Sequence, residues 1–158
     1  MLSYRELREE DIPGMASIRA AEWETREYWL GRISGYLTGE SNPQHARKPR
    51  VGYVACDSDV VIGFITGHLT TRHQCDGELE WINVVPEYRG SGAASELLRM
   101  LAKWFVEQKS PRVCVDVQPT NSAARKFYRR HGAVDLNPHW LVWHDIGVVL
   151  KNSPRAGT

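Results

Sequence analysis

Apolar residues along the chain follow two periods, and each period predicts one type of element. Between residues 92 and 108 they recur every three or four positions, the spacing of one face of a helix. They are Ala94, Leu97, Leu98, Leu101 and Phe105. Residues 121–131 repeat this spacing and end before Gly132, a residue type that commonly follows a helix. We therefore expect two amphipathic helices in the second half of the chain.

The first forty residues predict a strand and two further helices. Residues 2–8 read as a strand. Asp11 is typical of a helix start because its side chain can accept hydrogen bonds from the first turn, and this helix should continue to about Ala20. Residues 22–38 form a second helical stretch, which Gly39 ends.

Shorter apolar segments, many rich in β-branched residues, predict strands. We expect them at residues 51–56, 60–69, 78–85, 113–117 and 140–150, the last as one strand or a strand pair. The first two flank a short turn and form an antiparallel hairpin. Polar segments at 40–50 and 70–77 read as exposed loops.

The order of these elements predicts an α/β fold of the α+β type, with a mixed sheet and helices on its faces. The chain has 158 residues, enough for one domain with a single core. We place this domain at residues 1–150 and expect a flexible C-terminal tail at residues 151–158.

Composition narrows the functional classes. Lys and Arg number 20 and Asp and Glu 19, so the formal net charge is +1, whereas a nucleic-acid-binding domain usually has a clear basic excess. No apolar run approaches the roughly 20 residues that span a bilayer, and the N-terminus lacks the layout of a signal peptide. We expect neither nucleic acid nor a membrane as a partner.

Three cysteines, at positions 56, 75 and 114, form no Cys-x-x-Cys pair. Their odd number and wide spacing argue against a disulfide framework or a zinc site and favour the reducing cytoplasm. Cys56 and Cys114 lie in apolar runs and should be core residues. The six histidines show no metal-ligand spacing, so we expect no metal; His68 and His73 could border a substrate site.

The most informative segment runs from residue 84 to residue 94. A β-branched strand ends, a loop with Gly90 and Gly92 follows, and a long helix begins. Loop glycines let the backbone approach a ligand, and free N–H groups of a first helical turn favour a phosphate. The Walker sequence is absent, and Ser95 replaces the third glycine of the dinucleotide fingerprint. The segment predicts an anion cradle of another kind.

Two segments together resemble one family. Arg89-x-x-Gly92-x-Ala94 is similar to the Arg/Gln-x-x-Gly-x-Gly/Ala signature of the GNAT superfamily, the acyl-coenzyme-A-dependent N-acyltransferases. Residues 121–128, Asn-Ser-Ala-Ala-Arg-Lys-Phe-Tyr, and 131–133, His-Gly-Ala, resemble that family's second block. The resemblance implies a mostly antiparallel sheet flanked by helices and transfer of an acetyl group from acetyl-coenzyme A to a primary amine.

The chain departs from the family pattern at three positions. Ala93 stands where a larger aliphatic residue is usual, Ala94 where the signature more often has glycine, and Ala133 where phenylalanine is common. None of these changes removes the cradle, but Ala93 and Ala133 could loosen the packing beneath it.

The resemblance assigns residues to coenzyme A. The pyrophosphate would lie in the cradle, which consists of Arg89, Gly90, Ser91, Gly92, Ala93, Ala94 and Ser95. The backbone of Ile82, Asn83 and Val84 would run beside the pantetheine arm, with the Val84 amide as a donor to the thioester oxygen. Asn121 would contact the same arm, and it also suits the N-cap of its helix.

Acetyl transfer needs a base for the amine and an acid for the departing thiolate. Tyr128 matches the family's usual general acid, and a phenol with a pKa near 10 is protonated at neutral pH. Its position on the apolar face of a helix also suits a core residue, so both interpretations stay open here.

Three carboxylates are candidate bases: Glu80 first, then Glu78, then Asp116. Alternation along the strand predicts that Glu78 and Glu80 share a face with Ile82 and Val84. A carboxylate in such a half-buried strand has a raised pKa and can accept a proton. Each of the three could instead be a solvated or salt-bridged strand residue.

In the family the acceptor pocket is usually built by the first two helices, the loop after them and the last strands. Here these segments contain Trp23, Glu24, Tyr28, Trp29, Trp140 and Trp143. Aromatic rings and carboxylates suit a cationic amine, whereas Arg47, Lys48 and Arg50 would suit an acidic group on the acceptor. We expect a small-molecule or peptide amine as acceptor, and the sequence leaves open whether the chain forms a homodimer.

The sequence leaves two alternative functions open. A non-catalytic acyl-coenzyme-A-binding or interaction module with the same fold would bind the donor without transfer. A nucleotide-binding protein would use the glycine loop for ATP or NAD and would not respond to coenzyme A.

Overall fold

The structure, a computed structural model, describes residues 1–151. Seven strands form one sheet in the order β1-β2-β3-β4-β5-β7-β6. They are β1 (Leu2–Glu6), β2 (Ala46–Asp57), β3 (Val60–Thr70), β4 (Gly77–Val84), β5 (Val113–Asp116), β6 (Val134–Asn137) and β7 (Trp140–Trp143). Within the described residues only β4 and β5 pair in parallel, and the other neighbouring strands are antiparallel. The mixed, mostly antiparallel sheet is confirmed.

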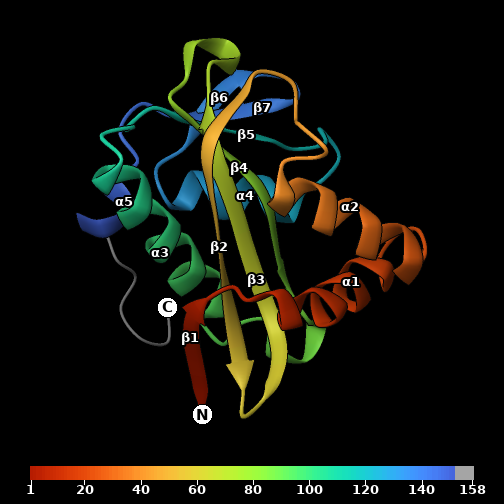
Figure 1. Cartoon of the computed structure of the whole chain (residues 1–158). Coiled ribbons are helices and arrows are strands. Elements are labelled where there is room, and N and C mark those ends of the chain that lie inside the picture. The colour runs from red at the N-terminus through yellow and green to blue at the C-terminus, as the bar shows by residue number, and fades with distance from the viewer. Residues whose placement is uncertain (152–158) are drawn as a thin grey trace.

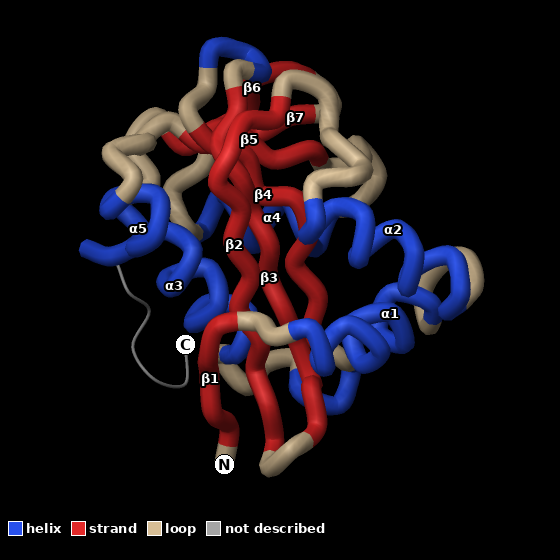
Figure 2. Tube along the Cα trace, viewed as in Figure 1, coloured by secondary structure: helices blue, strands red, loops and turns tan. Residues whose placement is uncertain are grey.

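Helices cover both faces of this sheet (Figures 1 and 2). They are α1 (Ile12–Ala20), α2 (Arg26–Thr38), α3 (Ala93–Glu107), α4 (Ser122–Arg130) and α5 (Val148–Lys151), with short 3-10 turns η1 (Glu9–Asp11), η2 (Arg72–Gln74) and η3 (Pro86–Tyr88). The pair α1 and α2 packs on one face, and α3 and α5 pack on the other. Among the helices of residues 1–151, none has the length and apolar character needed to cross a bilayer.

Two buried clusters hold these layers together. On the α3 side, Leu97, Leu101 and Phe105 pack against Ile65 and Leu79 of the sheet. On the α1–α2 side the cluster contains Met15, Trp29, Ile33, Tyr36, Phe64 and Trp81. Because both faces of the central strands are covered, β3 is buried continuously from Ile62 to Thr70 rather than in alternation, and the polar residues Thr66 and His68 are buried with it.

The ends of the first helices differ from the prediction. Asp11 does not cap α1: its carboxylate accepts a hydrogen bond from the backbone N of Arg8 (2.7 Å) and pairs with Arg5 (2.7 Å). The second helix begins at Arg26 rather than at residue 22, because the Thr25 hydroxyl caps it by accepting from Tyr28 N (3.0 Å).

Two other boundaries were also wrong. Strand β2 begins at Ala46, inside the segment expected to be a loop. The predicted strand at 140–150 ends at Trp143, and its partner β6 lies before it, at Val134–Asn137. All four β6 residues are exposed, so no alternation marks this edge strand. Lys151 belongs to α5, and the rest of the expected tail, residues 152–158, lies outside the described residues.

Candidate active site

A bulge in β4 opens the centre of the sheet. Leu79 pairs with Gly67 of β3, but Trp81 pairs with the adjacent Thr66, so Glu80 is an extra residue on β4. The pairing of β4 with β5 ends at the same point, where Leu79 lies opposite Val115. Bulges bend a strand and end its pairing. Beyond Leu79, the edge of β4 that faces β5 therefore has no strand partner among residues 1–151.

A cleft of about 880 Å³ lies where these strands part. Its walls come from β4, from the end of β5, from α4, and from Arg19 of α1 and Arg32 of α2. Most of the residues assigned to the donor and to catalysis line it: Glu78, Glu80, Ile82, Asn83, Val84, Arg89, Ala94, Asp116, Asn121 and Tyr128. The fold therefore brings together segments that are far apart in the sequence, from Arg19 of α1 to Tyr128 of α4.

The bulge also changes which side chains share a face. Ile82 and Val84 pack against the α3 cluster, whereas Trp81 packs on the α1–α2 side. Glu78 lies opposite His68, and Glu80 pairs with Arg32 of α2 (Nη2–Oε2 3.8 Å). The expectation that Glu78 and Glu80 share a face with Ile82 and Val84 was wrong, because one inserted residue reverses the alternation.

The glycine loop has the backbone that a cradle requires. Gly90 and Gly92 have φ values of 83° and 89°, in the left-handed region that glycine adopts at no steric cost. The hydrogen bond from Glu96 N to Gly92 O is the first of the α3 ladder (3.0 Å). Ala93 N donates to the Ser91 hydroxyl (3.3 Å), and the Ser95 hydroxyl lies 3.1 Å from His131 Nε2.

Arg89 and Asn83 connect this loop to the α1–α2 turn. Arg89 Nη2 donates to Glu22 Oε1 (3.0 Å), and Asn83 Nδ2 donates to the other oxygen of Glu22 (3.4 Å). Asn83 Oδ1 accepts from Arg19 Nη1 (2.8 Å). On the opposite wall, Asn121 caps α4 by accepting from Ala124 N (3.1 Å) and lines the cleft as well. Asn121 can therefore cap α4 and contact a ligand in the cleft at the same time.

Tyr128 is at once a core residue and a cleft residue. Its side chain is 5% exposed, its ring packs edge-on against Trp143 (centroids 5.7 Å apart), and it lines the cleft. Burial raises the pKa of Tyr128, and the nearby positive charge of Arg19 offsets only part of that rise. The phenol is therefore protonated across the physiological pH range and can act only as a proton donor there.

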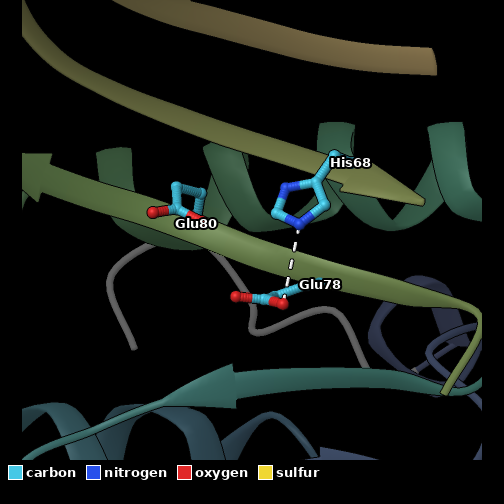
Figure 3. Close-up of side chains that lie close together, drawn as sticks. All are labelled: His68, Glu78 and Glu80. Carbon is cyan, nitrogen blue, oxygen red and sulfur yellow. Dashed lines mark ion pairs between the residues drawn. The ribbon is translucent and has the colours of Figure 1, made fainter. Parts of the chain in front are cut away.

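Glu78 and Glu80, which both line the cleft, form a carboxylate pair, and His68 lies next to Glu78 (Figure 3). Burial raises the pKa of Glu80, and the negative charge of Glu78 raises it further. Arg72 Nε donates to Glu78 Oε1 (3.1 Å). Two carboxylates in such proximity, one with a raised pKa, are suited to proton transfer. Asp116 lies at the cleft's exposed rim, where partial burial raises its pKa and His139 opposes the rise.

His68, Glu78 and Glu80 could also offer one nitrogen and two oxygens to a cation, since their ligand atoms lie within 4.8 Å of one another. However, Arg72 and Arg32 already compensate both carboxylates. A divalent ion would add positive charge beside two guanidinium groups. We therefore interpret the cluster as an acid–base group.

The aromatic residues assigned to the acceptor fall into two groups. Trp140 lines the cleft, with the Arg72 guanidinium 4.8 Å above its ring. Trp23 of the α1–α2 turn and Tyr28 and Trp29 of the first turn of α2 form an edge-to-face cluster, in which Trp29 is buried. Glu24 is an exposed residue of the α1–α2 turn, and none of these four residues lines the cleft.

Trp143 is fully buried, and its indole N–H donates to His131 O (3.1 Å). We therefore do not retain Trp143 as an acceptor contact. Sequence reasoning did not identify Arg19, Arg32, Arg72 or Trp81 as cleft residues. Arg19 and Arg32 are charged residues on helices that otherwise pack against the sheet, and this contrast could have identified both as candidate cleft residues.

A family model described as the acetyltransferase (GNAT) family matches residues 5–133. The chain belongs to the GNAT acetyltransferase family. The GNAT match includes the glycine loop, the bulged strand, and α4 with Tyr128. No curated protein sequence matches the chain significantly.

Solved structures support the GNAT fold. The PaiA N-acetyltransferase of Thermoplasma acidophilum, solved with coenzyme A, has a TM-score of 0.66 at 18% identity. The alignment covers 90% of this chain and 96% of the PaiA chain. An aminoglycoside N-acetyltransferase with coenzyme A has a TM-score of 0.70 at 19% identity, covering 87% and 90%. The NatC complex with Gag peptide and coenzyme A contains a chain with a TM-score of 0.66 at 18% identity, covering 89% and 94%.

Proposed function

We propose that this protein is an N-acetyltransferase that transfers an acetyl group from acetyl-coenzyme A to a primary amine of a small molecule or peptide. One observation carries the proposal: the bulge at Glu80 opens a cleft with the glycine loop at one end. The candidate base and the candidate acid Tyr128 line the same cleft.

The donor site follows from the backbone. The amides at the start of α3 lie outside the helical ladder and suit the pyrophosphate of coenzyme A, with Arg89 beside them. The edge of β4 from Ile82 to Val84, which β5 does not cover, suits the pantetheine arm. Acetyl-coenzyme A, when bound, supplies an acetyl group on a thioester.

The chain's own residues provide the proton transfers. Glu80 accepts the proton that an ammonium group must lose before it can attack, and a raised pKa makes this carboxylate a better proton acceptor. Tyr128 holds the proton that the departing thiolate needs. The amine nitrogen loses a second proton when the amide forms, which balances the proton that Tyr128 supplies.

The acceptor end of the cleft carries both signs of charge. Glu78 and Glu80 suit an amine, and their partners Arg32 and Arg72, which also line the cleft, each have several N–H donors to offer to an acceptor. Among the solved relatives, one is named for aminoglycosides and another is bound to a peptide. We propose an amine of either class. The cytoplasmic location stays a prediction, and the oligomeric state stays open.

A mass-spectrometric screen of amines with acetyl-coenzyme A, with thiol release followed in parallel, tests the proposal. We expect an acetylated product and an equal amount of free thiol for at least one amine. Coenzyme A should also raise the melting temperature, whereas ATP and NAD should not. Stabilisation by coenzyme A without transfer to any amine would instead support a non-catalytic binding module.

A further inference from the structure

His68 is a fully buried histidine that points toward the carboxylate pair (Figure 3). It lies on β3, directly opposite Glu78 of β4. Its Nδ1 is 2.8 Å from the hydroxyl of Tyr36, which is also fully buried. This contact fixes the orientation of the ring, so the other nitrogen, Nε2, has a defined direction.

Nε2 of His68 faces Glu78. It lies 3.5 Å from Glu78 Oε1, too far for a hydrogen bond of ordinary geometry, and no other group among the described residues bonds to it. An unpaired nitrogen in a fully buried ring costs stability. Its position beside two cleft carboxylates therefore points to a role in their ionisation.

The two ring nitrogens of His68 face different groups, and we assign the hydrogen to Nε2. An ionised Glu78 can only accept, so a hydrogen on Nε2 is the arrangement that favours the charged carboxylate 3.5 Å away. Nδ1 then accepts from the Tyr36 hydroxyl, 2.8 Å away. Burial raises the pKa of Tyr36 well above its usual value, so this phenol keeps its proton.

Other charges surround this cluster. On β4 are Glu78 and Glu80; from α2 come Tyr36 and Arg32; from η2 comes Arg72. Arg50 of β2 lies over the Tyr36 ring (4.8 Å), and Cys114 and Asp116 lie on β5 near Glu78. Arg32 and Arg72 balance the charges of the two glutamates, and an N–H of His68 directed at Glu78 adds a dipole that favours ionised carboxylates.

We propose that His68 is a positioning residue that, held by Tyr36 and directed at Glu78, favours the ionised form of Glu80 in the wall of the cleft, which is then ready to accept the amine's proton. This inference rests on the proposed function. The ligand atoms of His68 and Glu80 lie within 4.8 Å of each other, so the N–H of His68 stabilises the charged carboxylate and its removal should raise the pH at which Glu80 ionises.

Carboxylate titration by NMR, on protein labelled with ¹³C at the glutamate side chains and free of substrate, tests the inference without any activity. In His68→Leu the titration midpoint of Glu80 should rise by about one pH unit, a tenfold change in proton affinity. Tyr36→Phe keeps the imidazole but removes the hydroxyl that orients it, so it should raise the Glu80 midpoint by a smaller amount. In the unmutated protein, ¹⁵N spectra should show the His68 proton on Nε2.

Activity adds a second readout. The acidic limb of kcat/KM should move to higher pH in both variants, whereas Ile33→Val, a buried change on α2 without polar contacts, should leave it in place. Unchanged carboxylate midpoints, or a His68 proton on Nδ1, would overturn the inference. Failure to acetylate any amine would count against the proposed function alone, because the titration needs no transfer.

Discussion

Leu79 and Val115 form the last pair that joins β4 to β5, and the next residue of β4 is the bulged Glu80. The bulge therefore acts in two ways. It ends the pairing, which leaves an uncovered strand edge for a ligand, and it turns a carboxylate toward the resulting cleft. Binding and proton transfer thus depend on the same local irregularity.

Tyr128→Phe tests the acid. The ring keeps its packing against Trp143, but the proton for the thiolate is lost, so kcat should fall by a factor of roughly 100 to 10,000. Coenzyme A affinity, measured by calorimetry, should stay within a factor of about two of the original, since the hydroxyl contributes little to ground-state binding. Tyr53→Phe, on β2 and away from the cleft, is the matched control. Unchanged turnover in Tyr128→Phe would remove the assignment.

Glu80→Gln separates activity from stability. The pKa of Glu80 is raised in the folded protein, so folding favours its protonated form, and ionised Glu80 destabilises the fold as the pH rises through that pKa. The variant should therefore melt at a higher temperature than the original protein at neutral pH. This gain in melting temperature should disappear at a pH below the pKa that Glu80 has in the unfolded chain.

The same variant should lose activity and the acidic limb of its pH profile. The limb reports ionisation of the base, which an amide cannot undergo. If Glu80→Gln kept both its turnover and its acidic limb, Glu78 or Asp116 would become the leading candidate.

Gly92→Ala tests the cradle. At φ 89° an alanine is strained, so the substitution should cost about 1 kcal/mol of stability and weaken coenzyme A binding. Gly39→Ala is a close control, because Gly39 has φ 86° at the end of α2 and an added Cβ meets nothing at either site. The control should lose similar stability with no change in the dissociation constant. Equal loss of coenzyme A affinity in both variants would show that the effect is general.

Trp140→Ala tests the acceptor end of the cleft. Trp140 lines the cleft and Trp23 does not, although both were assigned to the acceptor from the sequence. Trp140→Ala should raise the acceptor KM by a factor of about five, as expected for loss of one aromatic contact, while Trp23→Ala leaves it unchanged. The reverse result would place the acceptor on the α1–α2 turn.

Sequence patterns predicted the elements that carry strong local signals. The helix at Ala93–Glu107 has a regular apolar stripe, and the loop with Gly90 and Gly92 has residue types that its backbone demands. Strand β6 and helix α5 were missed. Val134–Asn137 is an exposed edge without alternation, and Val148–Lys151 is helical because it packs on the α3 cluster despite two β-branched residues.

The sequence identified those candidate site residues that belong to a recognisable motif. It did not identify those that reach the cleft only through the tertiary structure. Tyr128 and Asn121 lie in one recognisable block. The bulge at Glu80 leaves no signal in the sequence, and it reversed the expected faces of β4. The roles of Arg19, Arg32 and Arg72 depend on how α1, α2 and η2 fold over the cleft.

A crystal structure with coenzyme A would test the donor site and its place beside Tyr128 in one measurement. We expect the pyrophosphate at the amides of Gly90–Ser95, the pantetheine arm along Ile82–Val84, and the sulfur within hydrogen-bond distance of the Tyr128 hydroxyl. A coenzyme A molecule bound outside the cleft between β4 and β5, or with its sulfur far from Tyr128, would contradict this expectation.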